Sequence, residues 1–274
     1  MQTEEQILKP ASLNSNAPIC HDEEYDVVYH RPTTLVDTNM HYCPGCAHSL
    51  VHKLIMEVVE EMDIQDKTIG IAPVGCSVFA YDYMNIDMQE AAHGRAAAVA
   101  TAVKRLMPDK YVFSYQGDGD LAAIGIAETL HAINRGENIL IVFMNNAVYG
   151  MTSGQMAPTT LPGMKTTTSP YGRDVKYYGA PIKVAEFMAQ LPGAYYVTRQ
   201  AVNSAHAVRK TRKALLNAFQ YQQLNKGTCL VEIIGNCPSN WRMTPLEASK
   251  FIDEEMVKAF PLGDVKVPVE EVNS

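Results

Sequence analysis

The sequence predicts an α/β fold, a doubly wound parallel sheet with helices on both faces. Short apolar segments, typical of buried strands, alternate along most of the chain with longer segments whose apolar residues recur every three to four positions. Glycine or asparagine pairs follow two of the short segments, as in sheets that bind ligands at one edge. The chain has 274 residues, 47% of them apolar and 19% charged, so it can bury a sizeable core.

The first half of the chain contains three predicted helices and three predicted strands. Leucine, isoleucine and valine lie at helical spacing in residues 48–62, and residues 91–107 are rich in alanine up to Pro108. β-branched and aromatic residues dominate the shorter segments, which favours strands. The predicted elements, in order, are a helix over 48–62, a strand over 68–72, a helix over 91–107, a strand over 111–115, a helix over 121–134 and a strand over 138–144.

A long irregular segment interrupts this alternation in the second half of the chain. Residues 152–181 are rich in threonine, proline and glycine, and a loop of this length inside a compact domain is usually functional or unstructured. The alternation then resumes. The predicted elements are a strand over 195–198, a helix over 204–221, a strand over 228–234 and a helix over 246–259.

The predicted elements belong to one domain with a segment on either side. Residues 1–38 show no sustained period, so we expect an irregular N-terminal arm there. The domain is expected over 39–240 and a C-terminal extension over 241–274.

Composition and charge exclude several classes of protein. Thirty acidic residues against 23 basic ones give a net charge of −7, which disfavours nucleic-acid binding. The longest strongly apolar run, 139–144, is too short to span a bilayer. The polar, acidic start of the chain does not resemble a secretory signal. We therefore expect a cytoplasmic protein without a membrane or nucleic-acid partner.

Two of the six cysteines form a Cys-x-x-Cys motif, Cys43-Pro-Gly-Cys46. In a reducing compartment this motif indicates metal, cluster or redox chemistry, and the proline and glycine favour a tight turn that points both sulfurs to one centre. Two structural or redox cysteines remain the alternative on this evidence.

The strand over 111–115 is followed by a loop with acidic residues between glycines. Gly117, Gly119 and Ala122 satisfy a dinucleotide-binding pattern, but Asp118 and Asp120 would then face a bare diphosphate. Because like charges at close range are costly, the loop makes sense if a divalent cation bridges protein and diphosphate.

The next strand along the chain ends in Asn145-Asn146-Ala-Val148. Mg²⁺ prefers about six oxygen ligands in octahedral geometry. The Asp118 carboxylate, the Asn146 amide oxygen and the Val148 backbone carbonyl would supply three of them, because consecutive βα units bring the two loops side by side. The sequence therefore predicts a magnesium site that also holds a diphosphate.

This pair of loops resembles the thiamine-diphosphate motif, which opens with GDG and closes with NN. Further segments in the same order resemble the β subunit of 2-oxoacid:ferredoxin oxidoreductases, especially the 2-oxoisovalerate and 2-oxoglutarate members. The similarity covers about 39–261. The segments are HYCPGCAHS, GIAPVGCS, HGRAAAVATAVK, GDGDLAAIG, NNAVYGMTSGQMAPTT and GNCPSNW.

The resemblance implies a [4Fe-4S] cluster and names its ligands as Cys43, Cys46, Cys76 and Cys237. Zinc would also accept four thiolates, and the residues alone leave that choice open. Cys229 lies in an apolar strand and is expected to be a small buried residue, whereas Cys20 lies in the arm.

The resemblance also implies a thiamine-diphosphate-binding fold and a set of residues around the cofactor. His93 precedes a helix whose N-terminus would favour an anion, although a capping role is the alternative. His48 and His52 have no third ligand at metal spacing and are expected on a helix surface. The expected cofactor-binding residues are Gly75, Cys76, Ser77, His93, Gly117, Gly119, Asp120, Asn145, Gly150, Met151 and Thr152.

The implied activity is oxidative decarboxylation of a 2-oxoacid to an acyl-coenzyme A, with electrons passed through the cluster to ferredoxin. The chain would hold only the diphosphate half of the thiamine site. An α subunit with a pyrimidine-binding domain would bring the glutamate that activates the cofactor, and γ and ferredoxin-like δ subunits would complete the complex. The chain has no cysteine run typical of ferredoxin clusters.

Two alternatives and the substrate stay open. A non-redox thiamine-diphosphate decarboxylase subunit would not need four cysteines, and a zinc-binding scaffold would bind no thiamine. The segment 154–173 looks more like the branched-chain and 2-oxoglutarate members than the pyruvate ones. Met151 or Met156 would suit a branched-chain acid, which we favour. Lys165 or Arg173 would suit a second carboxylate, unless both lie in a solvated loop.

Overall fold

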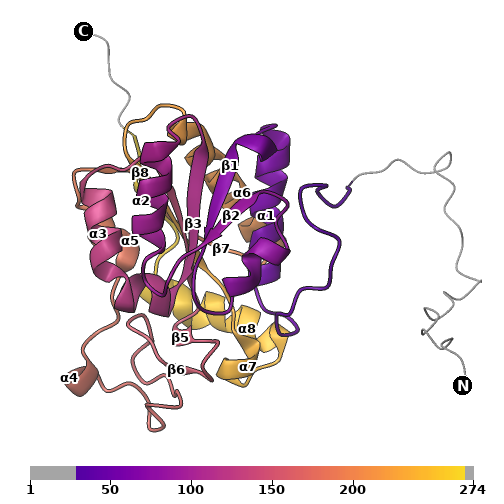
Figure 1. The fold of residues 1–274 in the computed structure, drawn as a ribbon. Helices are drawn as coiled ribbons and strands as arrows, with labels where there is room; N and C mark the ends of the chain where they lie inside the picture. Colours follow the sequence, from indigo (N-terminus) through magenta and orange to yellow (C-terminus); the bar gives the residue numbers. More distant parts are fainter. Residues whose placement is uncertain (1–28, 269–274) are drawn as a thin grey trace, which may run out of the picture. The chain divides into compact units, whose positions relative to one another are not determined.

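The computed structural model describes residues 29–268 (Figure 1). Two compact units divide the chain after Arg31, and the second unit, 32–274, carries all the helices and strands described below. Cys20 and most of the expected arm lie outside the described residues. The expected boundaries at residues 38 and 240 do not coincide with this division, because residues 32–38 and 241–268 belong to the second unit.

A seven-stranded sheet forms the centre of the second unit, in the order β2-β1-β3-β4-β8-β7-β9. All neighbouring strands are parallel except β7 and β9, which are antiparallel, so the predicted parallel sheet is confirmed with one antiparallel edge strand. The strands are β1 (Thr68–Ala72), β2 (Asp87–Glu90), β3 (Tyr111–Gly117), β4 (Leu140–Asn145), β7 (Ala194–Ala201), β8 (Thr228–Ile234) and β9 (Gly263–Lys266).

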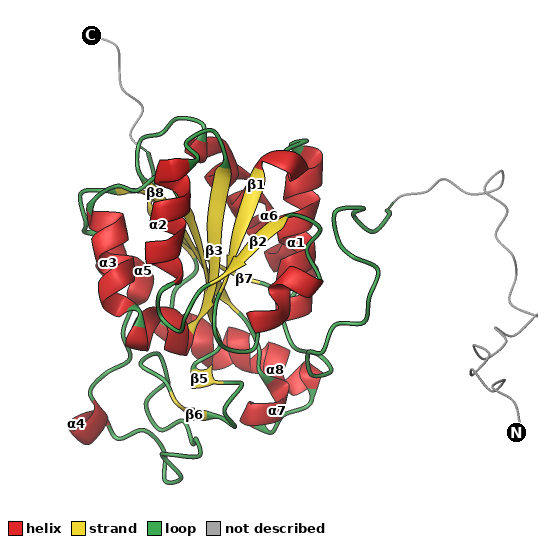
Figure 2. Ribbon diagram, viewed as in Figure 1, coloured by secondary structure: helices red, strands yellow, loops and turns green. Residues whose placement is uncertain are grey.

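Helices cover both faces of this sheet (Figure 2). Strand β4 is buried along its whole length, and its side chains alternate between two apolar cores: Leu140 and Val142 pack with one layer of helices, Ile141 and Phe143 with the other. One layer consists of α1 (His48–Glu61) and α6 (Ala205–Gln222). The other consists of α2 (Ala96–Leu106), α3 (Ile126–Asn134) and α5 (Val184–Ala189).

Two predicted helices begin later than expected, because two glycines bring their N-terminal ends together. Gly94 has a φ of +77°, and a Cβ there would lie 2.7 Å from Ile124 Cγ2 and 2.8 Å from the Gly125 nitrogen. Helix α2 therefore starts at Ala96 instead of residue 91. The segment expected as one helix over 121–134 is a π-helical turn, η3 (Asp118–Ile124), followed by α3 after Gly125.

The C-terminal elements pack against the rest of the unit. The predicted final helix is divided into α8 (Pro245–Phe251), the π-helical turn η4 (Ile252–Met256) and α9 (Val257–Ala259), and α7 (Pro238–Trp241) precedes it. With Trp241 and Leu161 they form a third apolar cluster. This cluster fixes the segment after β8 near the carboxyl ends of the strands.

The long loop is a loop with short regular pieces. It contains β6 (Gln155–Met156), which pairs in antiparallel fashion with β5 (Val148–Tyr149) just before the loop, and the single turn α4 (Val175–Tyr178). Two further short helical turns, η1 (Gln65–Lys67) and η2 (Val78–Asp82), flank β1. No helix among residues 29–268 is both long enough and apolar enough to cross a membrane.

Candidate functional site

A cavity of about 350 Å³ lies where the carboxyl ends of β1, β3 and β4 meet. The loops after these parallel strands form its wall, as expected for a ligand site in an open α/β sheet. A larger hollow of about 550 Å³ lies at the opposite end of β3 and β4, away from the glycine-rich loops. The cavity is lined by His48, Val74, Gly75, Cys76, Ser77, His93, Gly117, Asp118, Gly119, Asp120, Ala123, Ile124, Asn146, Val148, Tyr149, Gly150, Met151 and Thr152.

Asp118 stands at the first position after β3 and is almost fully buried. Its Oδ2 accepts a hydrogen bond from the Asn146 backbone nitrogen at 3.2 Å, and its Oδ1 accepts one from the Thr159 hydroxyl at 2.5 Å. Burial raises the pKa of the Asp118 carboxyl to about 7, although these hydrogen bonds act in the opposite direction. Residues 29–268 contain no ion pair to this carboxylate, so a bound cation would complete its environment.

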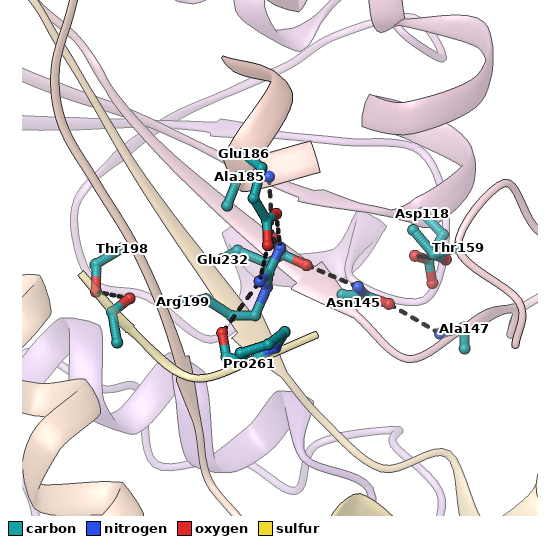
Figure 3. Close-up of polar contacts among 11 residues, drawn as sticks. Asp118, Asn145, Ala147, Thr159, Ala185, Glu186, Thr198, Arg199, Glu232 and Pro261 are labelled. Atoms are coloured by element: carbon teal, nitrogen blue, oxygen red, sulfur yellow. Dashed lines mark hydrogen bonds and ion pairs between the residues drawn. The ribbon is translucent and has the colours of Figure 1, made fainter. Parts of the chain in front are cut away.

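Asn145 does not line the cavity, in contrast to the expected direct contact with the cofactor. Its amide nitrogen donates to Glu232 Oε1 at 2.7 Å, and its amide oxygen accepts from the Ala147 nitrogen at 3.2 Å (Figure 3). Glu232 in turn pairs with the buried Arg199 at 3.0 Å. Asn145 therefore links the interior of the sheet to the backbone between Asn146 and Val148.

Asp120 holds three loops of the cavity together. Its Oδ1 accepts from the Gly94 nitrogen at 2.9 Å and from the Val74 nitrogen at 3.2 Å, and lies 2.8 Å from His93 Nδ1. Its Oδ2 accepts from Gln116 Nε2 at 2.7 Å. Through these contacts Asp120 connects the end of β3 with the loops that carry Val74 and Gly94, and so holds the wall of the cavity in shape.

The cavity offers room and donors for a diphosphate with a divalent cation. A Cβ at Gly75 or Gly117 would meet no atom within 4 Å, so open space lies against the backbone at both positions. Gly75 also has a φ of +143°, which favours glycine. Asp118, Asn146 and Val148 all line this cavity, and the Asn146 amide oxygen accepts from the Val148 nitrogen at 3.3 Å. Carboxylate, amide and carbonyl oxygens are ligands that suit Mg²⁺.

The four cysteines expected to bind a cluster all lie beside this end of the sheet. Cys43 and Cys46 precede α1, Cys76 follows β1 and Cys237 follows β8, and all four are free thiols. Burial raises the pKa of Cys76 to about 12, and the thiols of Cys237, Cys46 and Cys43 are near enough to add to this rise. Within residues 29–268, no three His, Cys, Asp or Glu side chains are grouped tightly enough for one metal ion.

Cys229 has the environment predicted for it. It is fully buried in β8, within one of the two apolar cores of the sheet, and burial raises the pKa of its thiol to about 12. Its packing is that of a small apolar residue.

A layer of histidine–tyrosine pairs, not predicted from the sequence, lies between the cavity and the Cys-x-x-Cys turn. The expected surface position of His48 and His52 is wrong, because both are buried. His48 Nδ1 lies 2.8 Å from the Tyr115 hydroxyl, and His52 Nε2 lies 2.7 Å from the Tyr42 hydroxyl. Burial lowers the pKa of His48 to about 4 and that of His52 well below its usual value. Their i, i+4 spacing does not reveal which face of α1 they occupy.

Lys165 and Arg173, two of the three basic residues of the long loop, are not among the residues that line the cavity. Arg173 is 5% exposed, and its guanidinium donates to backbone carbonyls of the loop, whereas a solvated position was the alternative expected for it. Lys165 is exposed and lines a separate hollow of about 570 Å³ with Trp241 and Phe251. No lysine or arginine lines the cavity itself.

Comparison with known proteins agrees with the motif and the fold. The family profile described as "Thiamine pyrophosphate enzyme, C-terminal TPP binding domain" matches residues 73–233. The ketoisovalerate oxidoreductase subunit VorA of Methanothermobacter thermautotrophicus is 44% identical over 264 residues, which are 96% of this chain and 53% of that protein. The 2-oxoglutarate synthase subunit KorB of Archaeoglobus fulgidus is 36% identical and is covered to 75%, against 78% of this chain.

A solved structure has the same fold over most of the chain. It is the 2-oxoglutarate:ferredoxin oxidoreductase from Magnetococcus marinus with 2-oxoglutarate, coenzyme A and succinyl-CoA bound. One of its chains matches with a TM-score of 0.73 at 25% identity, over 89% of this chain and 87% of that one. The present chain spans about half the length of the VorA relatives it matches. It belongs to the family of thiamine-pyrophosphate-binding subunits of 2-oxoacid:ferredoxin oxidoreductases.

Proposed function

We propose that this chain is the β subunit of a 2-oxoacid:ferredoxin oxidoreductase that converts a branched-chain 2-oxoacid, such as 2-oxoisovalerate, to its acyl-coenzyme A. The observation that carries the proposal is the cavity at the carboxyl ends of β1, β3 and β4, which the buried residues Asp118, Asn146 and Val148 line and beside which four free thiols lie. Electrons would leave through a cluster to ferredoxin.

Thiamine diphosphate would bind in this cavity with Mg²⁺. Asp118, Asn146 and the Val148 carbonyl would hold the cation. The glycine backbone at 75, 117 and 119 would admit the diphosphate, and Cys76, Ser77, His93, Gly150, Met151 and Thr152 would border the rest of the cofactor. When bound, the thiazolium supplies the electron sink for decarboxylation. The chain's own part is to orient the cofactor and keep water away from it.

Cys43, Cys46, Cys76 and Cys237 would bind a [4Fe-4S] cluster. Three separate loops supply these thiols, and their mutual influence on the pKa of Cys46 and Cys76 supports a shared centre. Cys76 also belongs to the cavity wall, so the cluster would lie next to the thiamine. Such a centre fits the reducing cytoplasm.

The cavity wall favours an apolar substrate side chain. A 2-oxoglutarate enzyme must pair a second carboxylate with a cation, but no lysine or arginine lines the cavity. Met151 lines it and is 53% exposed, so it is available to contact a branched aliphatic chain. The ketoisovalerate relatives support the same choice. The 2-oxoglutarate relatives keep 2-oxoglutarate as the second candidate.

A partner subunit would complete the site. Ile124 and Met151 line the cavity and are more than half exposed, and Phe79 and Tyr81 are exposed on η2 after the Cys76 loop. Exposed apolar side chains at a ligand site are typical of an interface. The expected partner is an α subunit with the pyrimidine-binding domain, and γ and ferredoxin-like δ subunits, ferredoxin and coenzyme A complete the system.

The test is the coenzyme-A-dependent reduction of a viologen dye by the anaerobically purified complex, with each 2-oxoacid in turn. We expect the highest kcat/KM with 2-oxoisovalerate. A strong preference for pyruvate or 2-oxoglutarate would contradict the substrate. Release of CO₂ without dye reduction would indicate a non-redox decarboxylase, and bound zinc without thiamine diphosphate binding would indicate a scaffold.

A further inference from the structure

The Thr159 hydroxyl contacts the carboxylate that we propose as a magnesium ligand. Thr159 Oγ1 donates to Asp118 Oδ1 at 2.5 Å, and both residues are buried (Figure 3). The hydrogen bond holds one carboxylate oxygen in place and leaves the other to the Asn146 nitrogen. Because each carboxylate oxygen has two lone pairs, these hydrogen bonds orient the carboxylate and still leave it able to bind a cation.

The next residue, Thr160, contacts the backbone between the other two proposed metal-binding residues, Asn146 and Val148. Its hydroxyl donates to the Ala147 carbonyl at 2.5 Å and accepts from the Ala157 nitrogen at 2.8 Å. Ala147 lies between Asn146 and Val148 and has a φ of +60°, a left-handed conformation that is unusual for alanine. Since its nitrogen donates to Asn145, Ala147 is held from the sheet on one side and from the long loop on the other.

Arg173 holds the backbone on either side of Thr159, at Pro158 and Thr160. Its buried guanidinium donates to six carbonyl oxygens at 2.7–3.2 Å, and residues 29–268 contain no ion pair to it. Because a buried charge is stable only when its donors are satisfied, these carbonyls must stay in place around it. Three belong to the segment that carries Thr159 and three to the end of α4: Ala157, Pro158, Thr160, Tyr178, Gly179 and Ala180.

We propose that Thr159, Thr160 and Arg173 are positioning residues for the magnesium–diphosphate site, and that the loop over 157–180 thereby sets the affinity for Mg²⁺. This role rests on the proposed function. It means that the loop over 157–180 supports the metal-binding residues without binding the metal ion itself. It also assigns Arg173 a task different from substrate binding. Groups that orient metal ligands typically contribute about 10- to 100-fold to metal affinity.

The test is a titration of Mg²⁺ at fixed thiamine diphosphate, with calorimetric cofactor binding as readout, on the full chain in its complex. Thr159→Val keeps the shape of the side chain but removes the donor. We expect Thr159→Val to raise the half-saturating Mg²⁺ concentration at least about tenfold, because the hydroxyl that orients Asp118 is lost. Thr159→Ser keeps this hydroxyl, so its half-saturating concentration should lie within about twofold of the wild-type value.

The matched control is Thr211→Val. Thr211 is buried in α6 and donates to the Ala201 carbonyl at 2.6 Å, far from the cavity wall. The Thr211→Val variant should lower the melting temperature as much as Thr159→Val does, but it should leave the Mg²⁺ titration unchanged. Equal Mg²⁺ titrations for wild type and Thr159→Val would overturn the proposal, and so would an equal effect of Thr211→Val.

Arg173→Lys keeps one charge but cannot reach six carbonyls. We expect Arg173→Lys to shift the Mg²⁺ titration as much as Thr159→Val does, and the double variant Thr159→Val/Arg173→Lys to shift it no further. The KM for the 2-oxoacid at saturating cofactor should not change. A raised KM with a normal Mg²⁺ titration would instead assign Arg173 to the substrate. If Arg173→Lys does not fold, Thr160→Val takes its place with the same expectations.

The outcomes separate this inference from the proposed function. Thiamine diphosphate binding to wild type with loss in Asp118→Ala, together with a normal Thr159→Val, would overturn the positioning role alone. Wild type that does not bind thiamine diphosphate with Mg²⁺ would overturn both.

Discussion

Among single residues, Asp118 and Asn146 carry the proposed metal binding. We predict that Asp118→Ala and Asn146→Ala each lose Mg²⁺-dependent thiamine diphosphate binding, because each removes one of three protein ligands, and that both variants stay folded. Calorimetry with and without Mg²⁺ measures the first effect and circular dichroism the second. Asp109→Ala, at an exposed turn, is the control. Normal cofactor affinity in either variant would contradict the site.

The cysteines lead to a second prediction for single residues. Each of four single variants should lose most of the iron and sulfide of the anaerobically purified protein, because each lacks one thiolate ligand. The variants are Cys43→Ser, Cys46→Ser, Cys76→Ser and Cys237→Ser. Cys229→Ser is the control within the described chain, since Cys229 is buried in β8, and Cys20→Ser should also keep the cluster. A full cluster in Cys237→Ser with loss in Cys229→Ser would show that the fourth ligand is another residue.

Sequence spacing identified the residues around the cavity but not the direction of every side chain. Asp118, Asn146 and Val148 follow adjacent parallel strands, so their meeting follows from topology. Asn145 is next to them, yet its alternating position directs the amide to Glu232. Arg173 lies in a segment rich in threonine and glycine, and its neighbour Asp174 accepts from the Lys176 nitrogen at the start of α4. The six carbonyl partners of Arg173 exist only after the loop folds.

Among the elements, strands β7 and β8 are joined by a buried ion pair, Arg199 with Glu232, at 3.0 Å and without exposed surface. We predict that Arg199→Met destabilises the fold by about 3–5 kcal/mol, because it leaves the Glu232 carboxylate buried and unpaired. Urea unfolding measures the loss. Arg212→Met, which removes partly exposed pairs with Glu57 and Glu61 on α1, should cost less than about 1 kcal/mol.

The Arg199→Met prediction has an internal check. The double variant Arg199→Met/Glu232→Leu removes the unpaired charge and should recover much of the lost stability. A loss below about 1 kcal/mol in Arg199→Met would show that this pair does not stabilise the junction of the two strands.

Long elements with a strong apolar period could be predicted, whereas short polar ones could not. Strand β8 has the expected bounds, and α1 and α6 differ by one residue at either end. Strand β2 is polar and mostly exposed, and β9 has four residues at the antiparallel edge, so neither has the apolar run of a buried strand. The first residues of α2 and α3 depend on the close contact of Gly94 and Gly125, which are far apart in the chain.

At the scale of the whole molecule, the cavity has the residues proposed to bind Mg²⁺ and the diphosphate but not the glutamate that the proposed reaction needs. The glutamate that activates thiamine is absent from its wall, because no glutamate is among the cavity residues of the described chain. The exposed Ile124 and Met151 at the same cavity suit a covering subunit. The loss of water from the site on assembly would strengthen every polar contact to the cofactor.

We therefore predict that the chain alone binds thiamine diphosphate with Mg²⁺ but reduces no viologen with any 2-oxoacid. Addition of the α partner should restore coenzyme-A-dependent reduction, because the partner would supply both the activating glutamate and the remaining wall. Stopped-flow and steady-state assays at increasing partner concentration measure this, and activity should reach a plateau near one partner per chain. A partner with glutamine in place of the activating glutamate should assemble without restoring activity. Equal turnover by the isolated chain would contradict a divided site, since the residues around this cavity would then have to supply the proton acceptor themselves.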